Sequence, residues 1–219
     1  MLRAVLKRIP GVARGARFLR ALRFRTLSPR ARFEEIYRKQ SWGNPRESLS
    51  GSGSSLDKTQ AIRASLPGLL SDLDVKSLLD VPCGDFYWMQ AVDLGQVRYL
   101  GGDIVPDVIR TNALRYASAH RRFFEVDLVR DPLPQADLVL CRDCLVHLSH
   151  GDALAALANI RKSGSRYLLA TTFPAVTRNR DILTGNWRPI NLCAAPFEMK
   201  QPLLTIHEHD GKHLGLWAL

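Results

Sequence analysis

The sequence lacks the marks of a membrane-spanning or secreted protein. No run approaches the ~18 to 20 uninterrupted apolar residues that a membrane-spanning helix needs. The N-terminus has no apolar segment followed by a small-residue cleavage site, as a secretory signal peptide would have. With 219 residues, of which 46% are hydrophobic, the chain can form one domain with a full core. We therefore expect a single domain in the cytoplasm.

Cysteine is scarce, and its pattern predicts neither disulfide bonds nor a metal site. The four cysteines, Cys83, Cys141, Cys144 and Cys193, fall in or beside expected buried strands, as reduced thiols do in cytosolic proteins. Cys141 and Cys144 form a C-x-x-C pair, but no second Cys pair or His pair stands at the spacing of a zinc site. We therefore predict no bound metal.

Acidic residues are absent from the first 32 positions. This segment holds ten of the 31 Lys and Arg residues, which leaves 21 basic and 21 acidic side chains in the rest of the chain. The net charge of +10 thus belongs to the N-terminal segment, so it gives no reason to expect a nucleic-acid-binding face elsewhere. We divide the chain into a basic amphipathic arm, residues 1–32, and a domain, residues 33–219.

The arm has three interpretations, which the sequence leaves open. Leu2, Val5, Leu6 and Ile9 form an apolar stripe at helical spacing, with basic residues largely off it. A mobile basic tail, a helix that binds an anionic membrane surface or a partner, and an organellar targeting peptide all fit an Arg-rich segment without acids. A peripheral membrane contact through residues 1–32 is thus one expectation.

Most glycines of the dinucleotide-binding motif are missing from the stretch that organises the chain, K-S-L-L-D-V-P-C-G-D-F-Y-W-M at residues 76–89. Its apolar run breaks at residues 82–84, which predicts a buried parallel strand ending in a tight turn at a ligand. A dinucleotide fold uses G-x-G-x-x-G, whereas only Gly84 remains here. Asp85 and Phe86 place an anion and a bulky ring where a phosphate would approach. The turn therefore predicts a cationic ligand without phosphate.

Two ordered motifs resemble a known enzyme family. D-V-P-C-G-D-F, residues 80–86, is similar to the first motif of class I, Rossmann-like S-adenosylmethionine (SAM)-dependent methyltransferases, D-x-G-x-G-x-G, and departs from it at two glycines. It looks closer to a subgroup of mostly bacterial methyltransferases with D-x-P-C-G-D-F-x-W-M followed by C-R-D-C-L-V-H-L, the string at residues 141–148 here. The resemblance covers roughly residues 33–219. It implies SAM as cofactor, a ligand with a sulfonium, an ammonium and no phosphate.

Alternating strand and helix patterns predict an α/β fold. The expected strands are residues 78–81, 98–105, 122–128, 136–141, 166–173, 202–209 and 213–219. The last two are joined by a tight turn and should pair antiparallel. With the resemblance, this predicts a Rossmann-like, mostly parallel seven-stranded sheet with helices on both faces and a C-terminal antiparallel hairpin.

Helices and loops between these strands carry their own signals. A short helix is expected at residues 32–38 and another at 106–119. Ser54 with Asp57, and Ser149 with Asp152, form capping boxes that predict helix starts, and Pro67 should kink or split the first of these two helices. The Ser- and Gly-rich segment 41–55 is either a flexible linker or a flap over the cofactor; Trp42 and Glu47 favour the flap.

Acidic residues at successive strand ends complete the expected cofactor site. An acid 19 residues after Gly84, Asp103, is placed to accept hydrogen bonds from ribose hydroxyls. By resemblance, residues 80–84 hold the methionine part and Asp127 with Leu128 the adenine, and Gly102 lets the ribose approach the backbone. The expected cofactor-binding residues are Asp80, Pro82, Cys83, Gly84, Asp85, Gly102, Asp103, Ile104, Asp127, Leu128 and Arg142.

The string C-R-D-C-L-V-H-L also supplies the expected catalytic residues His147, Arg142 and Asp143. Enzymes that methylate amino nitrogens of bases typically have N-P-P-Y or D-P-P-Y at this place, so its absence counts against such an acceptor. His147 is expected to act as general base for a hydroxyl, with Asp143 four residues earlier to orient the ring, and Arg142 is a candidate for an anionic acceptor. A structural role for His147, and neutralisation of Asp143 by Arg142, remain alternatives.

The sequence thus predicts a SAM-dependent methyltransferase that methylates oxygen on a small molecule or a saccharide. Two alternatives stay open. One is an RNA methyltransferase tethered by its basic arm, whose binding would weaken steeply with salt. The other is a SAM-binding partner protein without catalysis, since a fold does not fix a function.

Overall fold

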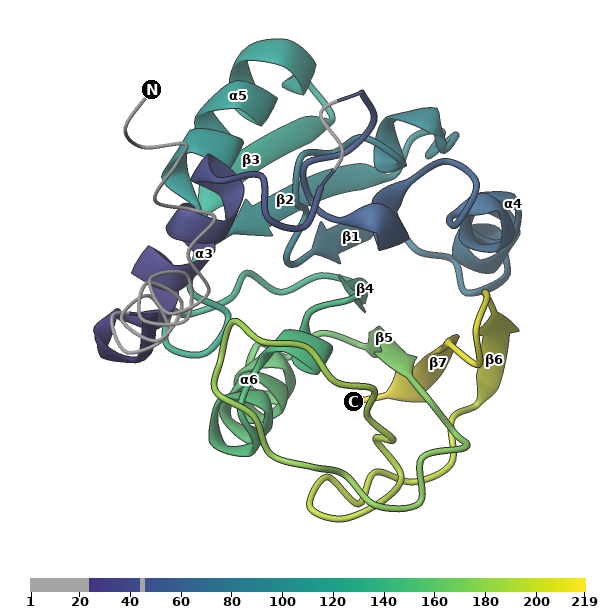
Figure 1. The fold of residues 1–219 in the computed structure, drawn as a ribbon. Helices are drawn as coiled ribbons and strands as arrows, with labels where there is room; N and C mark the ends of the chain where they lie inside the picture. The colour runs from purple at the N-terminus through teal and green to yellow at the C-terminus, as the bar shows by residue number, and fades with distance from the viewer. Residues whose placement is uncertain (1–23, 44–45) are drawn as a thin grey trace, which may run out of the picture.

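Seven strands form one sheet in the order β3-β2-β1-β4-β5-β7-β6 (Figure 1). The computed structural model describes residues 24–43 and 46–219. The strands are β1 Ser77–Asp80, β2 Arg98–Asp103, β3 Arg121–Glu125, β4 Leu138–Cys141, β5 Tyr167–Thr172, β6 Leu204–His207 and β7 His213–Ala218. β7 pairs antiparallel with both β5 and β6, and the other pairs are parallel. The predicted mostly parallel sheet with a C-terminal hairpin is confirmed.

Buried apolar runs explain why β1 and β4 lie at the centre. Every residue of Ser77–Asp80 and of Leu138–Cys141 is buried, as expected for strands that are covered on both faces. Successive side chains point to opposite faces, so Leu78 packs in one core cluster and Leu79 in the other. The first cluster includes the apolar side chains of α4 and α5, and the second includes those of α6.

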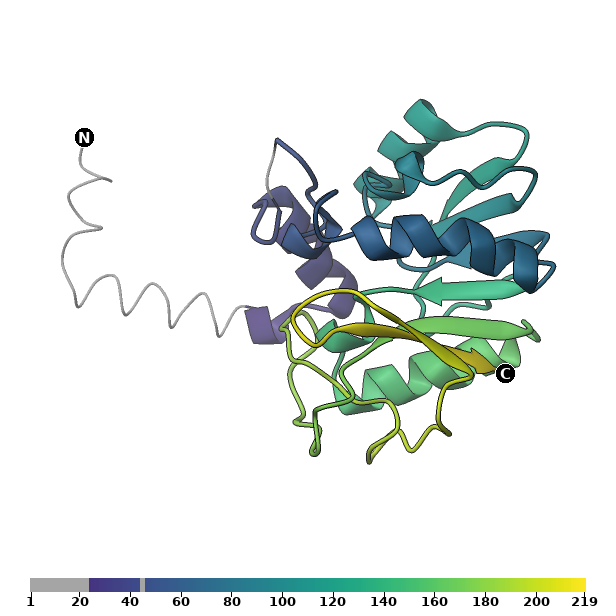
Figure 2. The same ribbon diagram turned by 90° about the vertical axis from the view of Figure 1, so that its right-hand side faces the viewer.

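The helices cover the two faces of the sheet, as predicted (Figure 1). Four α-helices have both their first and their last residue among the described residues: α3 Pro29–Arg38, α4 Gln60–Asp72, α5 Pro106–Tyr116 and α6 His150–Lys162. Short 3₁₀ helices are η2 Ser52–Ser54, η3 Met89–Ala91 and η4 Leu145–His147. α3 and the loop after it lie beyond the carboxyl ends of the parallel strands (Figure 2). They cover the end of the sheet where a ligand is expected.

The two predicted capping boxes have different outcomes. Ser149 is the N-cap of α6, and its hydroxyl accepts a hydrogen bond from the N–H of Asp152 at 3.1 Å, as predicted. The Ser54 box is wrong, because Ser54 ends η2 and the next helix, α4, begins at Gln60 after Thr59. Ser54 faces the ligand cavity instead. Pro67 does not split α4, which runs unbroken through it.

Most of the predicted arm, residues 1–23, lies outside the described residues, so its three interpretations stay open. The described part of the arm packs on the domain. The guanidinium of Arg32 is buried and donates to the carbonyl oxygens of Phe24, Arg25 and Thr184 at 2.9 to 3.0 Å. The boundary at residue 32 remains a prediction. Among the described residues, no helix is long and apolar enough to cross a membrane.

Candidate active site

A cavity opens at the carboxyl ends of β1, β2 and β4, with about 1000 Å³ of empty space including its mouth. Its lining combines aromatic and aliphatic side chains with several carboxylates, as small-molecule sites do. Pro29, Phe33 and Tyr37 of α3 contribute to its lining, as do Trp42 and Ser50. The loop at residues 46–55 therefore covers the cavity as the flap interpretation requires.

The predicted site residues converge on this cavity with one exception. Lining residues from the predicted set are Asp80, Pro82, Cys83, Gly84, Asp85, Asp103, Ile104, Asp127, Leu128, Arg142, Asp143 and His147. Gly102 does not line it. A Cβ at Gly102 would lie 2.6 Å from Cγ1 of Val126, just after β3, so packing by itself requires a glycine here. The cofactor contacts of the other residues stay a prediction.

The turn after β1 is fixed by hydrogen bonds on every side. The N–H of Cys83 donates to the carbonyl of Gly102 at 2.8 Å, and the side-chain amide of Asn112 donates to the carbonyl of Gly84 at 2.7 Å. Gly84 has φ +54°, and a Cβ there would lie 2.4 Å from Oγ of Ser50. Only glycine fits this position, because both its backbone conformation and the overlying loop exclude a side chain.

Asp80 ends β1 at the floor of the cavity. Its carboxylate is 2% exposed and accepts a hydrogen bond from the hydroxyl of Tyr99 at 2.7 Å. Burial raises the pKa of Asp80 to about 7, against the opposing effects of Tyr99 and Arg142. A cation beside this carboxylate would favour its ionised form.

Asp103 ends β2 and faces the same turn. Its carboxylate accepts hydrogen bonds from the N–H of Gly84 at 3.1 Å and from the N–H of Val105 at 3.0 Å. Burial raises the pKa of Asp103 to about 6, although these backbone donors lower it. Each carboxylate oxygen has a second lone pair, so the group can also accept from a ligand hydroxyl.

Asp127 and Leu128 follow β3, where the adenine is expected. The carboxylate of Asp127 accepts from the N–H of Val129 at 2.9 Å and from Arg130 at 2.9 Å. Leu128 is 7% exposed and lies in the core cluster below the cavity. Together they form an apolar wall with a polar edge.

Asp85 binds the loop that covers the cavity. Its carboxylate accepts from the hydroxyls of Ser48 and Ser50, each at 3.0 Å, and from the N–H of Leu49 at 2.7 Å. The N–H of Asp85 in turn donates to Oγ of Ser50 at 2.8 Å, and Tyr37 lies 2.7 Å from the same hydroxyl. Asp85 therefore holds the loop closed over the turn, a role that the motif did not reveal.

Phe86 lies behind the turn, away from the cavity. Its ring is 1% exposed and packs against Tyr99 and Phe123 with centroid distances of 5.1 and 5.2 Å. The prediction that this ring obstructs an approaching phosphate is wrong, because Phe86 is a core residue. Of the two residues expected to repel phosphate, only Asp85 lines the cavity.

Four charged side chains surround the end of β4, and three of them, Arg142, Glu208 and Lys212, are buried. Arg142 donates to Oε1 of Glu208 through Nε at 3.0 Å and Nη2 at 2.9 Å, and its Nη1 lies 3.2 Å from Asp143. Lys212 contacts both carboxylates, at 2.8 Å for Asp143 and 3.1 Å for Glu208. The Nη2 of Arg142 also donates to the carbonyl of Gly53 in the covering loop at 2.8 Å. This cluster joins β4, the C-terminal hairpin and the loop.

The cluster stabilises the ionised forms of its members. Burial opposes the charge of Arg142, but Asp143 and Glu208 outweigh it and raise the pKa of the guanidinium. Burial likewise opposes the charge of Asp143, but Arg142 and Lys212 lower its pKa. The expected role of Arg142 with an anionic acceptor would compete with these contacts. Sequence analysis missed Glu208 and Lys212, which lie 66 and 69 residues from their partners.

His147 ends η4 on the opposite side of the cavity. Its Nδ1 lies 2.9 Å from the carbonyl oxygen of Asn186, and its ring stacks on Trp42 with a centroid distance of 4.2 Å. A carbonyl oxygen only accepts hydrogen bonds, so Nδ1 carries the proton and Nε2 is the basic atom of the neutral ring. The expected orienting contact from Asp143 is wrong, because Asn186 makes it.

Burial lowers the pKa of His147 below its ordinary value, against the opposing effects of Asn186 and Asp143. The neutral ring is therefore favoured near pH 7. Asp152 and Thr184 also line this side of the cavity, and sequence analysis assigned neither to the site. The capping box marked Asp152, but only as a helix start. Among the described residues, no group of three or more His, Cys, Asp or Glu side chains is arranged to hold a metal ion.

No protein-family model matches the sequence, and no curated protein matches it. Among solved structures, human N-acetylserotonin methyltransferase in complex with SAM is similar, with a TM-score of 0.57 and 14% identity over 74% of this chain and 52% of that one. PigF with SAH has a TM-score of 0.55 and 12% identity over 74% and 55%. The methyltransferase domain of bacterial CtHen1 has a TM-score of 0.51 and 12% identity over 74% and 99%.

The chain thus spans about half the length of the first two proteins. At these identities the likeness concerns the fold, and it shows that this chain has the Rossmann-like fold of SAM-dependent methyltransferases.

Proposed function

We propose that the protein is a SAM-dependent methyltransferase that methylates a hydroxyl of a small-molecule or saccharide acceptor. The observation that carries the proposal is the pair of buried carboxylates, Asp80 and Asp103, on either side of the Gly84 turn. This arrangement suits a ligand with a cationic group and a ribose. It suits a pyrophosphate poorly, because Arg142, the single Lys or Arg among the described lining residues, is bound to Glu208 and Asp143.

The residues present fit this cofactor. Asp103 is placed to accept ribose hydroxyls, and Asp127 and Leu128 would border the adenine. Asp80 and residues 82–84 would hold the methionine part, where its ammonium would offset the cost of an ionised Asp80. SAM, when bound, supplies a methyl group on a sulfonium, which is its own leaving group.

The protein's part in the transfer is then alignment and proton removal. An alcohol is a weak nucleophile until its proton leaves, and Nε2 of His147 is free to accept that proton. The methyl group would pass from sulfur to the acceptor oxygen, the C–S electron pair would stay on sulfur, and the O–H proton would go to His147. The stack on Trp42 fixes the plane of the ring.

A small acceptor agrees with the covered cavity. α3 and the loop at residues 46–55 lie over it, and Asp85, Arg142 and Arg32 hold these segments down. Among the described residues, its lining contains six carboxylates and one guanidinium, which would repel a nucleic-acid backbone. These observations favour a small acceptor over RNA.

Transfer of a labelled methyl group tests this function. The protein is incubated with SAM carrying a radioactive methyl group and with fractionated cell extract, and label is measured in glycan, lipid, RNA and small metabolites. Label in small metabolites or saccharides is expected, with loss in Asp103→Ala and retention in Asp107→Ala, whose carboxylate is on the exposed first turn of α5. Label in RNA alone would contradict the acceptor class, and SAM binding without any transfer would leave a binding protein.

A further inference from the structure

The part of the cavity beside His147 is called the acceptor end, and its lining is mostly apolar. It is formed by Pro29, Phe33, Trp42, Leu148, Asp152 and Thr184. Phe33 meets the edge of Trp42 with ring centroids 5.9 Å apart, and Trp42 stacks on His147. Apolar and aromatic walls suit a compact organic body, so the charge of Asp152 stands out.

Asp152 and His147 border the same end because residues 184–186 connect them. The hydroxyl of Thr184 donates to Oδ2 of Asp152, and the N–H of Gly185 donates to the carbonyl of His147 at 2.8 Å. Asn186 then accepts from the His147 ring. A ligand with its reacting hydroxyl at Nε2 of His147 therefore has Asp152 within its surroundings.

The carboxylate of Asp152 differs from the others that line the cavity. Asp85 and Asp103 accept backbone N–H groups, and Asp127 and Asp143 have cationic partners. Asp152 receives only the Thr184 hydroxyl, on Oδ2, from the residues that the structure describes. None of the described Lys or Arg side chains lies within ion-pair distance of it. Asp152 lines the cavity, and its Oδ1 has no hydrogen-bond donor among the residues that the structure describes.

The charge around the cavity adds to this local preference. Six carboxyl groups from the described residues line it, those of Asp80, Asp85, Asp103, Asp127, Asp143 and Asp152, and Arg142 supplies the one guanidinium from the same part of the chain. Glu208 and Lys212 behind the wall have opposite charges, so they do not alter the balance. The cavity therefore has a negative field, in which a cationic ligand is favoured over a neutral one and an anionic ligand is disfavoured.

We propose that the methyl acceptor is a hydroxyl compound that also carries a protonated amine, and that Oδ1 of Asp152 binds this ammonium group. The inference rests on the proposed methyltransferase function and names the chemical class of its substrate. The ammonium has no lone pair and is not methylated. Its binding to Asp152 instead places the hydroxyl of the acceptor at His147. An anionic acceptor, such as a carboxylate or a phosphate ester, is disfavoured by the same charges.

Matched probe compounds test the proposal. Tyramine, tyrosol and 4-hydroxyphenylacetate share a phenol and carry an amine, an alcohol and a carboxylate; glucosamine, glucose and glucuronate form a second such set. Binding to the full-length protein saturated with S-adenosylhomocysteine is measured by calorimetry or ligand-observed NMR. The amine of at least one set should bind about tenfold more tightly than its neutral partner, the size of one hydrogen bond to a charged group, and the carboxylates should bind most weakly.

Two variants test whether Asp152 is the residue that binds the amine. Asp152→Asn keeps the backbone cap of α6 and an oxygen for Thr184, and it should abolish the preference for the amine while binding of the neutral compound stays the same. Asp107→Asn, at the first turn of α5 outside the cavity, should keep the preference. Equal or weaker binding of both amines, no binding of any probe, or an unchanged preference in Asp152→Asn overturns the proposal.

Binding of S-adenosylhomocysteine is measured separately. A failure of the proposed substrate class can therefore be told apart from a failure of the proposed function. If the wild-type protein binds S-adenosylhomocysteine but shows no amine preference, only the substrate class is wrong. If it does not bind S-adenosylhomocysteine, the proposed function itself is wrong. Because the wild-type comparison needs no variant, the test stands even if Asp152→Asn unfolds.

Discussion

The imidazole of His147 stacks on the indole of Trp42, with ring centroids 4.2 Å apart and an angle of 24° between the planes. The partners come from distant parts of the sequence, Trp42 from the segment after α3 and His147 from η4. The stack shields one face of the ring from water, and the carbonyl of Asn186 fixes its proton on Nδ1. Trp42 and Asn186 therefore fix the orientation of the ring.

Removing the stack should change the titration of His147. In the wild type, burial lowers the pKa of His147 below its ordinary value of about 6.5, with Asp143 opposing and Arg188 adding to the effect. Trp42→Ala admits water and should raise this pKa toward 6.5, whereas Trp42→Phe should keep it low. Histidine NMR titration measures it, with Trp187→Ala, at a side chain that is 57% exposed, as control. An unchanged pKa in Trp42→Ala would count against a shielding role.

Loss of the base should slow turnover. His147→Ala should reduce kcat by about 10²- to 10⁴-fold with SAM affinity nearly unchanged, since the ring is placed to remove the acceptor proton and not to hold the cofactor. The acidic limb of the pH profile should disappear with it. Near-normal turnover once the acceptor is known, or a parallel loss of SAM binding, would return His147 to a structural role.

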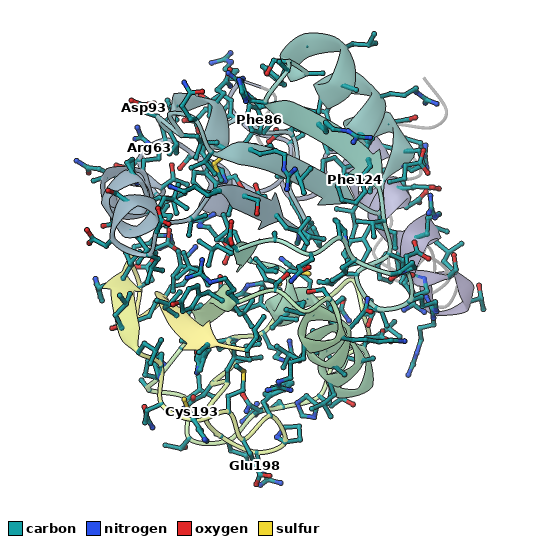
Figure 3. All side chains as sticks on the ribbon, turned by 180° about the vertical axis from the view of Figure 1, so that it is seen from behind. Arg63, Phe86, Asp93, Phe124, Cys193 and Glu198 are labelled. Atoms are coloured by element: carbon teal, nitrogen blue, oxygen red, sulfur yellow. The ribbon has the colours of Figure 1, made fainter. Side chains whose placement is uncertain are left out.

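Asp85 should keep the covering loop in place. Asp85→Ala removes the acceptor of Ser48, Leu49 and Ser50, so amide hydrogen exchange in residues 46–55 should increase and SAM affinity should fall about tenfold. Asp93→Ala, on the exposed loop after η3, is the matched control (Figure 3). Unchanged exchange in Asp85→Ala would show that the loop is held by other contacts.

Cofactor binding should release protons near neutral pH. Burial raises the pKa of Asp80 to about 7 and that of Asp103 to about 6 in the empty protein, and a bound cation with its ribose favours the ionised forms. SAM affinity should therefore weaken as the pH falls from about 8 to about 5. Calorimetry at pH 7 in two buffers of different ionisation enthalpy measures the release. Asp80→Asn, which keeps an acceptor for Tyr99, should reduce it, and a release equal to that of the wild type would contradict the assignment.

The raised pKa values of Asp80 and Asp103 also make the stability of the fold depend on pH. A carboxyl whose pKa is raised by folding holds its proton more tightly in the folded state. Its stabilising contribution is present at low pH and is lost as the pH rises through the folded pKa, here about 6 for Asp103 and about 7 for Asp80. Asp143 has a lowered pKa, so its contribution is instead lost as the pH falls below about 4.

Breaking the buried charge cluster should destabilise the fold. Glu208→Gln leaves Arg142 and Lys212 with one carboxylate, and its cost should be about 3 to 5 kcal/mol in urea unfolding. Adding Lys212→Met removes one charge of each sign, so the double variant should be less destabilised than the sum of the single ones. Asp210→Asn, in an exposed pair with Lys58, should leave the free energy of unfolding nearly unchanged. Strict additivity would argue against coupling.

Strand ends could be predicted from the sequence, because parallel strands bring their carboxyl ends to one edge. Asp80 and Asp103 were placed in the site by their positions after apolar runs, and both line the cavity. Spacing could not show that Gly102 is required by Val126, since both a ligand and a packed side chain exclude a Cβ. The sequence pattern also misplaced the start of α4. Ser54 has the residue type of a helix cap, but it lies in η2.

Contacts between segments that are distant in the chain could not be predicted from the sequence. Glu208 binds Arg142 and Lys212 binds Asp143 at sequence separations of 66 and 69 residues, and nothing local marks them. Asp85 stands in a motif, but its binding to Ser48 depends on how the preceding loop folds back. Asp152 was explained by the capping box that Ser149 begins, and only the structure shows that it lines the cavity.

Calorimetry with four ligands tests the central claim most directly. The full-length protein is titrated with SAM, S-adenosylhomocysteine, NAD and NADP, and Asp103→Ala is titrated with SAM. The account predicts binding of the first two and far weaker binding of the nicotinamide nucleotides, because the carboxylates around the Gly84 turn disfavour phosphate. It predicts a loss of about 1 to 3 kcal/mol of SAM binding in the variant, with its melting unchanged. Tight binding of NAD or NADP, or SAM binding that is insensitive to Asp103→Ala, would contradict it.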